Sequence, residues 1–371
     1  MKQRSSGLNK TTRTKHKGAI IVKRNLLIKV VSIALSTIML FVANITVFAG
    51  EFSSDFNIQS EATREYLSLV RGYMTPELAR QFELLLVFDE MLQSRSGMDV
   101  QIHRGIQAQI NMLAPPLSED GRFIIGISDL SDELLMESII NFTGIDRSMI
   151  DFIHFNMMYI PTDPHIEIEY APSHEDIERQ LPGGVFTMGT NINILTSAGA
   201  RHATMGHPTN QWGNRFITVS HGSVRVGDVV RVGTQNIGVV TRTVFTTFPR
   251  GVDIAEVAFT DGSTVGTRLP NGQTLDFPIQ APPRSTSAGL PVNLLTRGGS
   301  FISGSLIHAS AVVRSNLGEW HDMIAVNMWA AQGDSGGALI WNISTFSFAG
   351  GTFTFFDPSL GIAVFSRSDN Y

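Results

Sequence analysis

Five residues, Gly333–Gly337, place a serine between glycines in the order Gly-Asp-Ser-Gly-Gly. Because glycine lacks a Cβ, such a turn lets backbone N–H groups approach a reacting atom closely. The N–H groups of Gly333 and Ser335 are the candidates to hold the negative charge that develops on a carbonyl oxygen. Taken alone, the segment also fits a glycine-rich hairpin whose serine has no chemical role. The rest of the chain has to decide between these two interpretations.

Chain order separates the two kinds of enzyme that such a turn permits. The spacing Gly-x-Ser-x-Gly also fits the nucleophile turn of α/β-hydrolases, in which the acid and the histidine follow the serine. The last histidine of the chain is His321, which precedes Ser335, so this order is excluded. The remaining order is a histidine, then an aspartate, then the serine.

Both partners occur upstream of the serine in suitable surroundings. His221 ends a β-rich run that starts at Phe216, and Asp253 stands at the head of an apolar run. The separations are 32 residues from His221 to Asp253 and 82 residues from Asp253 to Ser335. With these three motifs in this order, residues 183–371 resemble the chymotrypsin-fold serine proteases, in particular the compact bacterial streptogrisin and α-lytic type.

The resemblance assigns a role to each motif. The serine motif matches the family at all five positions, the Asp253 segment matches its Asp-x-Ala pattern, and Thr218–His221 matches threonine-alanine-glycine-histidine in part. Ser335 is then the expected nucleophile and His221 the general base, with Asp253 as its partner. The backbone N–H groups of Gly333 and Ser335 are the expected oxyanion hole, and no cofactor is required.

Three further residues are candidates for a substrate pocket. Trp329 and Gln332 precede the serine motif, and by family position the bulky ring of Trp329 lies near the pocket floor and makes it shallow. Ser366 lies in a segment that resembles the substrate-pairing edge. The chain stops at Tyr371, 36 residues after Ser335, where the family adds another strand and a terminal helix. The domain is therefore expected either to be truncated or to close incompletely.

Composition narrows the class of protein. Of 371 residues, 43% are hydrophobic and 16% are charged, which is enough apolar material for a buried core. The net charge of −5, with no long basic patch in the body of the chain, gives no electrostatic footprint for nucleic acid. Without cysteine there is no disulfide and no cysteine nucleophile. His202, His207 and Asp228 match no standard zinc spacing, so no metal site is expected.

The first 49 residues are typical of an export signal. A long basic stretch precedes the nearly uncharged run Val30–Ala43, and Val47–Ala49 offers a cleavage site. The alternative is an uncleaved membrane anchor, because Val30–Ala49 is about long enough to cross a bilayer. The body of the protein is therefore expected to be secreted, or anchored in the membrane if the segment is retained.

Residues 50–182 differ in pattern from the rest. Apolar residues at helical spacing predict helices over 61–94, starting anew at Thr75-Pro76, and 121–155 predicts strand, helix, strand. This α+β texture resembles the pro-segments of bacterial proteases, which bind the protease domain, although an ordinary accessory domain fits as well. From residue 183 onward, short strands alternate with glycine-bearing turns, as in all-β domains. The resemblance implies a double barrel of chymotrypsin type there.

The sequence therefore predicts an exported serine endopeptidase that acts on protein or peptide substrates. It predicts no nucleic-acid partner and no membrane partner after signal cleavage. The proline- and glycine-rich stretch between about Tyr170 and Gly184 predicts a cut that releases an active β domain from a precursor. The alternative is a catalytically weak or inactive binding protein on a protease-like scaffold.

Overall fold

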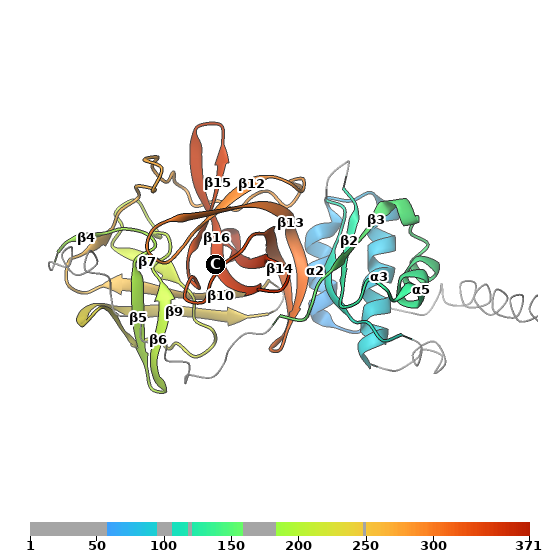
Figure 1. Cartoon of the computed structure of the whole chain (residues 1–371), viewed down its shortest axis with the longest axis horizontal. Coiled ribbons are helices and arrows are strands. Elements are labelled where there is room, and N and C mark those ends of the chain that lie inside the picture. The colour runs from blue at the N-terminus through green and yellow to red at the C-terminus, as the bar shows by residue number, and fades with distance from the viewer. Residues whose placement is uncertain (1–57, 95–105, 118–120, 159–182, 248–249) are drawn as a thin grey trace, which may run out of the picture. The chain divides into compact units, whose positions relative to one another are not determined.

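The structure is a computed structural model that describes residues 58–94, 106–117, 121–158, 183–247 and 250–371 (Figure 1). The expected export signal at residues 1–49 and the expected linker up to residue 182 lie outside the described residues. Within the described ranges, no helix is both long enough and apolar enough to span a membrane.

The first barrel carries the histidine and the aspartate. Its antiparallel strands have the order β6-β5-β8-β9-β10-β7. They are β5 (Asn191–Thr196), β6 (Gly199–Thr204), β7 (Arg215–Thr218), β8 (Val229–Val232), β9 (Gln235–Thr246) and β10 (Val252–Phe259). The chain after β6 turns back onto β7, where the Gly206 N–H donates to the Ile217 carbonyl (2.9 Å) and the Ile217 N–H donates to the His207 carbonyl (2.9 Å). These bonds join the two outer strands and close the sheet.

The second barrel carries the serine. Its strands have the order β12-β15-β16-β17-β14-β13, and β12 also pairs with β13, so the six strands form a closed ring. They are β12 (Pro291–Leu295), β13 (Phe301–Ser315), β14 (Gly318–Asn327), β15 (Ala338–Ile343), β16 (Phe346–Asp357) and β17 (Ile362–Arg367). A short parallel pair, β4 (Val185–Phe186) and β11 (Thr264–Val265), and the 3-10 turn η2 (Ser368–Asn370) complete residues 183–371. The predicted all-β double barrel is confirmed.

Two-residue alternation explains how the strands close around a core. On β5, Ile192 and Ile194 are buried while their neighbours are half-buried, and Val230 and Val232 repeat the pattern on β8. Successive strand side chains point to opposite faces, so all four residues reach one side of the sheet. They belong to a single apolar cluster that also includes Leu295 and Ile340 from the second barrel. The two barrels therefore share buried side chains.

The N-terminal region, residues 58–158, extends the second sheet. It contains α2 (Glu61–Arg71), α3 (Pro76–Ser94), β1 (Ile110–Ala114), β2 (Phe123–Ile127), α5 (Glu133–Thr143), η1 (Arg147–Met149) and β3 (Ile150–His154). Strand β1 pairs antiparallel with both β2 and β13, and β3 pairs parallel with β2. The sheet thereby grows to nine strands, with helices α2, α3 and α5 beside the added strands (Figure 1).

The helix starts in this region follow capping chemistry. The predicted start at Thr75-Pro76 is confirmed, because the Thr75 hydroxyl accepts a bond from the Leu78 N–H (3.3 Å). The cap of α5 is Asp132, whose Oδ1 accepts from the Leu135 N–H (2.9 Å). Its other oxygen also accepts backbone N–H groups from the segment before β1. That long-range contact is not visible in the local sequence.

Candidate active site

Strand register brings His221 next to Asp253. Strand β10 pairs with β7 so that Ala255 lies opposite Thr218. Asp253 is two residues before Ala255, and His221 is three residues after Thr218. Because the strands are antiparallel, the two residues reach the same end of the pair. Asp253 has no exposed surface, whereas 16% of the His221 side chain is exposed.

The carboxylate of Asp253 is surrounded by donors. Its Oδ2 lies 2.9 Å from His221 Nδ1. Its Oδ1 accepts from the His221 N–H (2.7 Å), the Ser220 N–H (3.1 Å) and the Ser220 hydroxyl (2.8 Å). Since a carboxylate only accepts, Nδ1 carries the proton and Nε2 is left with a lone pair. The arrangement leaves a base pointing away from Asp253.

The backbone of His221 is held in an uncommon conformation. Its φ is 45°, in the left-handed region that a non-glycine residue seldom adopts. The two bonds from this one residue to Asp253, through the backbone N–H and through the ring, offset the strain. The aspartate therefore fixes both the ring and the chain that carries it.

The serine segment consists of two consecutive tight turns between β14 and β15. The Asp334 N–H donates to the Ala331 carbonyl (3.1 Å), and the Gly337 N–H donates to the Asp334 carbonyl (2.8 Å). The third residue of each turn is a glycine with positive φ, 95° for Gly333 and 94° for Gly336. A turn in which only the third residue has a positive φ is a type II turn, and glycine adopts that conformation without steric cost.

The turns leave two backbone donors open. Among the described residues, neither the Gly333 N–H nor the Ser335 N–H donates a hydrogen bond, whereas the Asp334 N–H between them is bonded. Two such amides, that of the serine and that of the residue two positions before it, are what an oxyanion hole requires. The predicted donors are therefore not occupied by any described residue.

Other groups anchor the turns. Asp334 is buried, and its carboxylate accepts from the Arg297 N–H (2.9 Å) and the Ala331 N–H (2.9 Å). Among the described residues, the Asp334 carboxylate forms no hydrogen bond with His221. Thr204 at the end of β6 donates its N–H to the Ser335 carbonyl (2.8 Å) and its hydroxyl to the Gly333 carbonyl (2.7 Å). The serine segment is thus fastened to the first barrel through its carbonyls.

Close backbone approach brings the serine segment alongside the histidine strand. A Cβ added to Gly336 would lie 2.3 Å from the Thr218 hydroxyl oxygen and 3.1 Å from the Val219 nitrogen, so only glycine fits. Val219 is two residues before His221. Among the described residues, no hydrogen bond joins the Ser335 hydroxyl to the His221 ring. In free enzymes such bonds are often long and tighten only when substrate binds.

The three pocket candidates lie in different surroundings. Trp329 and Gln332 are exposed beside the serine segment, and the Trp329 ring packs on Gly361, the residue before β17. Ser366 is fully buried, and its hydroxyl accepts from the Asp253 N–H (2.9 Å) and bonds to the Thr354 hydroxyl (3.0 Å). Its side chain therefore faces the aspartate and not an open surface.

Sequence reasoning missed a strand end beside the serine. Strand β16 pairs with β15 only as far as Thr352, opposite Ala338 at the start of β15. One residue further, Phe353 exchanges two backbone bonds with the serine segment, from the Gly336 N–H (2.9 Å) and to the Gly337 carbonyl (2.8 Å). Beyond Phe353, β16 continues to Asp357 without β15 beside it. Only the register of β15 and β16 could have indicated this segment.

Comparisons with known proteins give structural likenesses only. No family model matches the chain, and no curated protein is significantly similar to it in sequence. The fold is similar to Nocardiopsis protease (20% identity, TM-score 0.39, 50% of this chain and 94% of that chain). It is also similar to Cellulomonas bogoriensis chymotrypsin (20% identity, TM-score 0.38, 50% of this chain and 93% of that chain). A third similar structure is Thermobifida fusca protease A (21% identity, TM-score 0.38, 50% of this chain and 94% of that chain).

Proposed function

We propose that this chain is an exported serine endopeptidase that uses His221, Asp253 and Ser335. One observation carries the proposal: a histidine bonded through Nδ1 to a buried aspartate lies beside a glycine turn with two open N–H groups. An ordinary glycine-rich hairpin has no need of either feature. The likenesses above are consistent with peptide substrates.

The proposed reaction proceeds through an acyl-enzyme. Ser335 Oγ attacks the peptide carbonyl carbon while His221 Nε2 takes the hydroxyl proton, and the carbonyl oxygen becomes an oxyanion facing the Gly333 and Ser335 N–H groups. The C–N bond then breaks, and His221 gives its proton to the leaving amine. Water repeats the sequence and releases the acid. Asp253 holds the tautomer and stabilises the imidazolium in both halves.

The segment of β16 beyond Phe353 is the proposed place for substrate. An extended peptide can add to a free strand segment by backbone hydrogen bonds. Such a peptide would run beside residues 354–357 and past Ser335. Trp329 and Gln332, exposed near the turn, are then the side chains that we propose contact the substrate. Ser366 is better explained as support for Asp253.

A fluorophosphonate probe tests the proposal, because it reacts with an activated serine and not with an ordinary one. The wild type should be labelled at Ser335, and Ser335→Ala and His221→Ala should not be labelled. Labelling should decline in acid, because the imidazole has to be neutral to accept the proton. A folded wild type that stays unlabelled at neutral pH contradicts the proposal.

A second candidate is a protease-like binding protein without catalysis. One observation favours it: no hydrogen bond joins the Ser335 hydroxyl to His221 within the described part of the chain. It predicts a folded chain that binds peptides and is not labelled by the probe. Peptide binding by Ser335→Ala would be as tight as by the wild type in either case, so labelling is the measurement that decides.

Export and maturation are part of the proposal and rest on sequence. Residues 1–49 would direct export, and the region between about Tyr170 and Gly184 would be the site of a precursor cut. The amino-terminal sequence of the secreted wild type and of Ser335→Ala tests both. A cut found only in the wild type indicates self-cleavage, and a cut found in both indicates another protease.

A further inference from the structure

We propose that the N-terminal region activates the enzyme. It would do so by holding the His221–Asp253 pair in place through contacts with β14. This inference rests on the proposed function. It differs from the sequence-based expectation that the released β domain is the active species. The positioning residues are Tyr66 of α2 together with Trp320 and His321 of β14.

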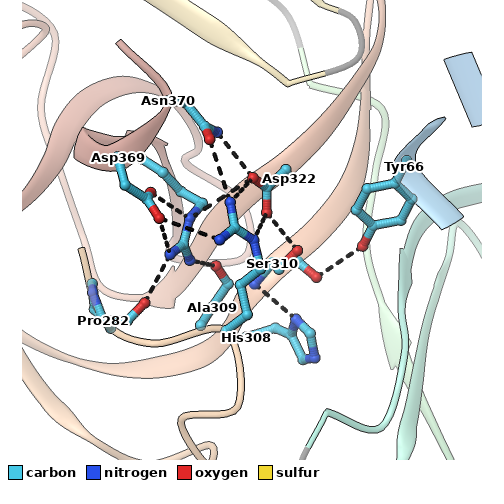
Figure 2. Close-up of polar contacts among 10 residues, drawn as sticks. Tyr66, Pro282, His308, Ala309, Ser310, Asp322, Asp369 and Asn370 are labelled. Carbon is cyan, nitrogen blue, oxygen red and sulfur yellow. Dashed lines mark hydrogen bonds and ion pairs between the residues drawn. The ribbon is translucent and has the colours of Figure 1, made fainter. Parts of the chain in front are cut away.

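The first step is the contact between α2 and the second barrel. Tyr66 is fully buried, and its hydroxyl donates to the Ser310 carbonyl of β13 (3.0 Å) (Figure 2). Its ring lies against the His321 ring of β14, with centroids 5.4 Å apart. Burial lowers the pKa of His321 to about 4, so at neutral pH its ring is uncharged and suited to this packing.

A buried polar network fixes β13 and β14 where α2 docks. The Ser310 hydroxyl donates to Asp322 (2.6 Å), the residue that follows His321. Asp322 has no exposed surface and also receives two bonds from Arg284 (2.9 and 2.5 Å) and one from Asn370 (3.0 Å) (Figure 2). Buried charges of this kind hold a single geometry, because leaving either partner unpaired is costly. His321 therefore has a defined position between α2 and the first barrel, which carries His221 and Asp253.

The second step leads from β14 to the aspartate. The His321 carbonyl accepts from the Gly251 N–H (2.5 Å), and the His321 N–H donates to the Thr247 carbonyl (3.1 Å). Both bonds fasten the connection between β9 and β10, and Gly251 is two residues before Asp253. A Cβ on Gly251 would lie 2.3 Å from Met323 Sδ and 2.9 Å from the His321 carbonyl oxygen, so the two chains are in direct contact.

The third step leads from β14 to the histidine. Trp320 is fully buried and packs edge-on against Phe245 of β9, with centroids 5.3 Å apart. The Phe245 ring in turn lies 3.3 Å from where a Cβ of Gly222 would stand, the residue after His221. Neighbouring residues of β14 thus support both members of the pair.

The core around Trp320 is shared with the N-terminal region. One apolar cluster contains Trp320 and Met323 together with N-terminal side chains. The N-terminal members are Met112, Ala114, Ile124, Phe155 and Met158. A buried ion pair between Arg314 and Asp89 and a bond from His308 to the Pro115 carbonyl (2.8 Å) add to the same contact. Losing the region would expose the side of Trp320 that it covers.

Substitution at Tyr66 in the full-length chain tests the inference, with the fluorophosphonate labelling rate at Ser335 as readout. Tyr66→Leu should lower the rate about tenfold, because a small displacement of catalytic groups is amplified in the rate. It should also change the pH at half-maximal labelling, since Asp253 would hold His221 less closely. Tyr66→Phe keeps the ring contact and should lie between Tyr66→Leu and the wild type.

Phe88→Leu is the matched control. Phe88 is a buried ring of α3 that packs against Phe142 within the N-terminal region (5.3 Å). It should lower the melting temperature about as much as Tyr66→Leu without changing the pH profile. If both variants lose labelling in proportion to the folded fraction, the role of Tyr66 is only structural and the inference is wrong.

A cut chain tests the inference even if Tyr66→Leu does not fold. A recognition site for a specific protease is placed within residues 165–175, and the folded full-length protein is cut and passed through a sizing column. Co-elution of the two fragments with full labelling supports the inference, as does separation with loss of labelling. A separated β fragment that is labelled at the wild-type rate overturns it, and so does a co-eluting complex that is not labelled. An uncut protein without labelling would instead reject the proposed function.

Discussion

The two halves of the candidate site are built in opposite ways. On the first barrel, four hydrogen bonds converge on the carboxylate of Asp253. On the second barrel, the serine segment is held by its carbonyls and by the Asp334 side chain. Its two relevant N–H groups and the serine hydroxyl form no hydrogen bond with any described residue.

The difference fits the role proposed for each half. A general base needs one tautomer and one orientation throughout, so its partners are saturated in the resting protein. An oxyanion hole needs donors that are aimed in advance and still empty, because their benefit comes only when charge develops. Fastening a turn by its acceptors is a way to fix donors without occupying them. Variants that change one half of the site at a time test this comparison.

The largest effect is expected for the groups where the halves meet. Ser335→Ala and His221→Ala should each lower kcat by about 10⁴-fold or more, and the double variant should be no worse, because the residues act as one unit. Peptide hydrolysis and melting temperature are measured together. Full activity in either folded variant would exclude the triad.

Asp253→Asn changes only the half of the site on the first barrel, the His221–Asp253 pair. The amide can donate to Nδ1 and so favour the wrong tautomer, which in the serine-protease type case lowers kcat about 10⁴-fold with the geometry intact. Unlike the serine variant, this one should keep Ser335 and show slow residual labelling by the fluorophosphonate. Labelling at the wild-type rate would mean that Asp253 has only a structural role.

Gly333→Ala changes only the half of the site on the second barrel, the serine segment with its two unbonded N–H groups. Gly333 has a φ of 95°, which strains any residue with a Cβ, and the added atom would lie 2.8 Å from Arg297 Nη1, so the Arg297 side chain also has to move. Removing one oxyanion donor typically costs 10²- to 10³-fold in kcat, and we expect about 10²-fold here. Gly272→Ala is the matched control, because its φ is 84° and nothing lies within 4 Å of the added atom. Equal kcat losses in both variants would contradict the role of Gly333.

The sequence indicated the candidate residues more readily than the contacts that support them. Ser335, His221 and Asp253 could be proposed because glycine spacing, residue type and chain order are readable from the sequence alone. The contact of Ser366 with Asp253 could not be predicted, since it depends on how β17 meets β10, 113 residues away in the chain. The α+β texture of residues 58–158 was predicted, but their addition to the second sheet through β13 was not. Pairing between distant strands leaves no periodic signal in either one.

Three buried histidines predict that the folded protein becomes less stable in acid. Burial lowers the pKa of His207, His308 and His321 to about 4, because the charged form loses its hydration. In the unfolded chain their pKa is about 6.5. The unfolded state therefore binds more protons between these values, and the free energy of unfolding falls as the pH falls from about 6.5 toward 4. Burial raises the pKa of Asp89 and of Glu319, and these two groups oppose the trend of the three histidines.

Urea unfolding between pH 7 and pH 5 measures this effect. Each histidine contributes a slope of up to about 1.4 kcal/mol per pH unit. His207→Gln should reduce the total slope, because the amide can still bond to the Pro208 carbonyl and the Tyr371 hydroxyl without taking up a proton. A slope that is the same in His207→Gln and in the wild type would mean that His207 is not buried in the neutral form.

The smallest effect is expected for Ser366→Ala. The Asp253 N–H would lose its acceptor while the carboxylate kept all four of its donors, so the aspartate should loosen without leaving its place. We expect kcat to fall by about threefold to tenfold with KM unchanged. Ser347→Ala is the control, because Ser347 is as deeply buried and bonds to Gln273 (3.2 Å) and not to the site. A change in KM or in substrate preference at constant kcat would return Ser366 to the substrate pocket, as the sequence first indicated.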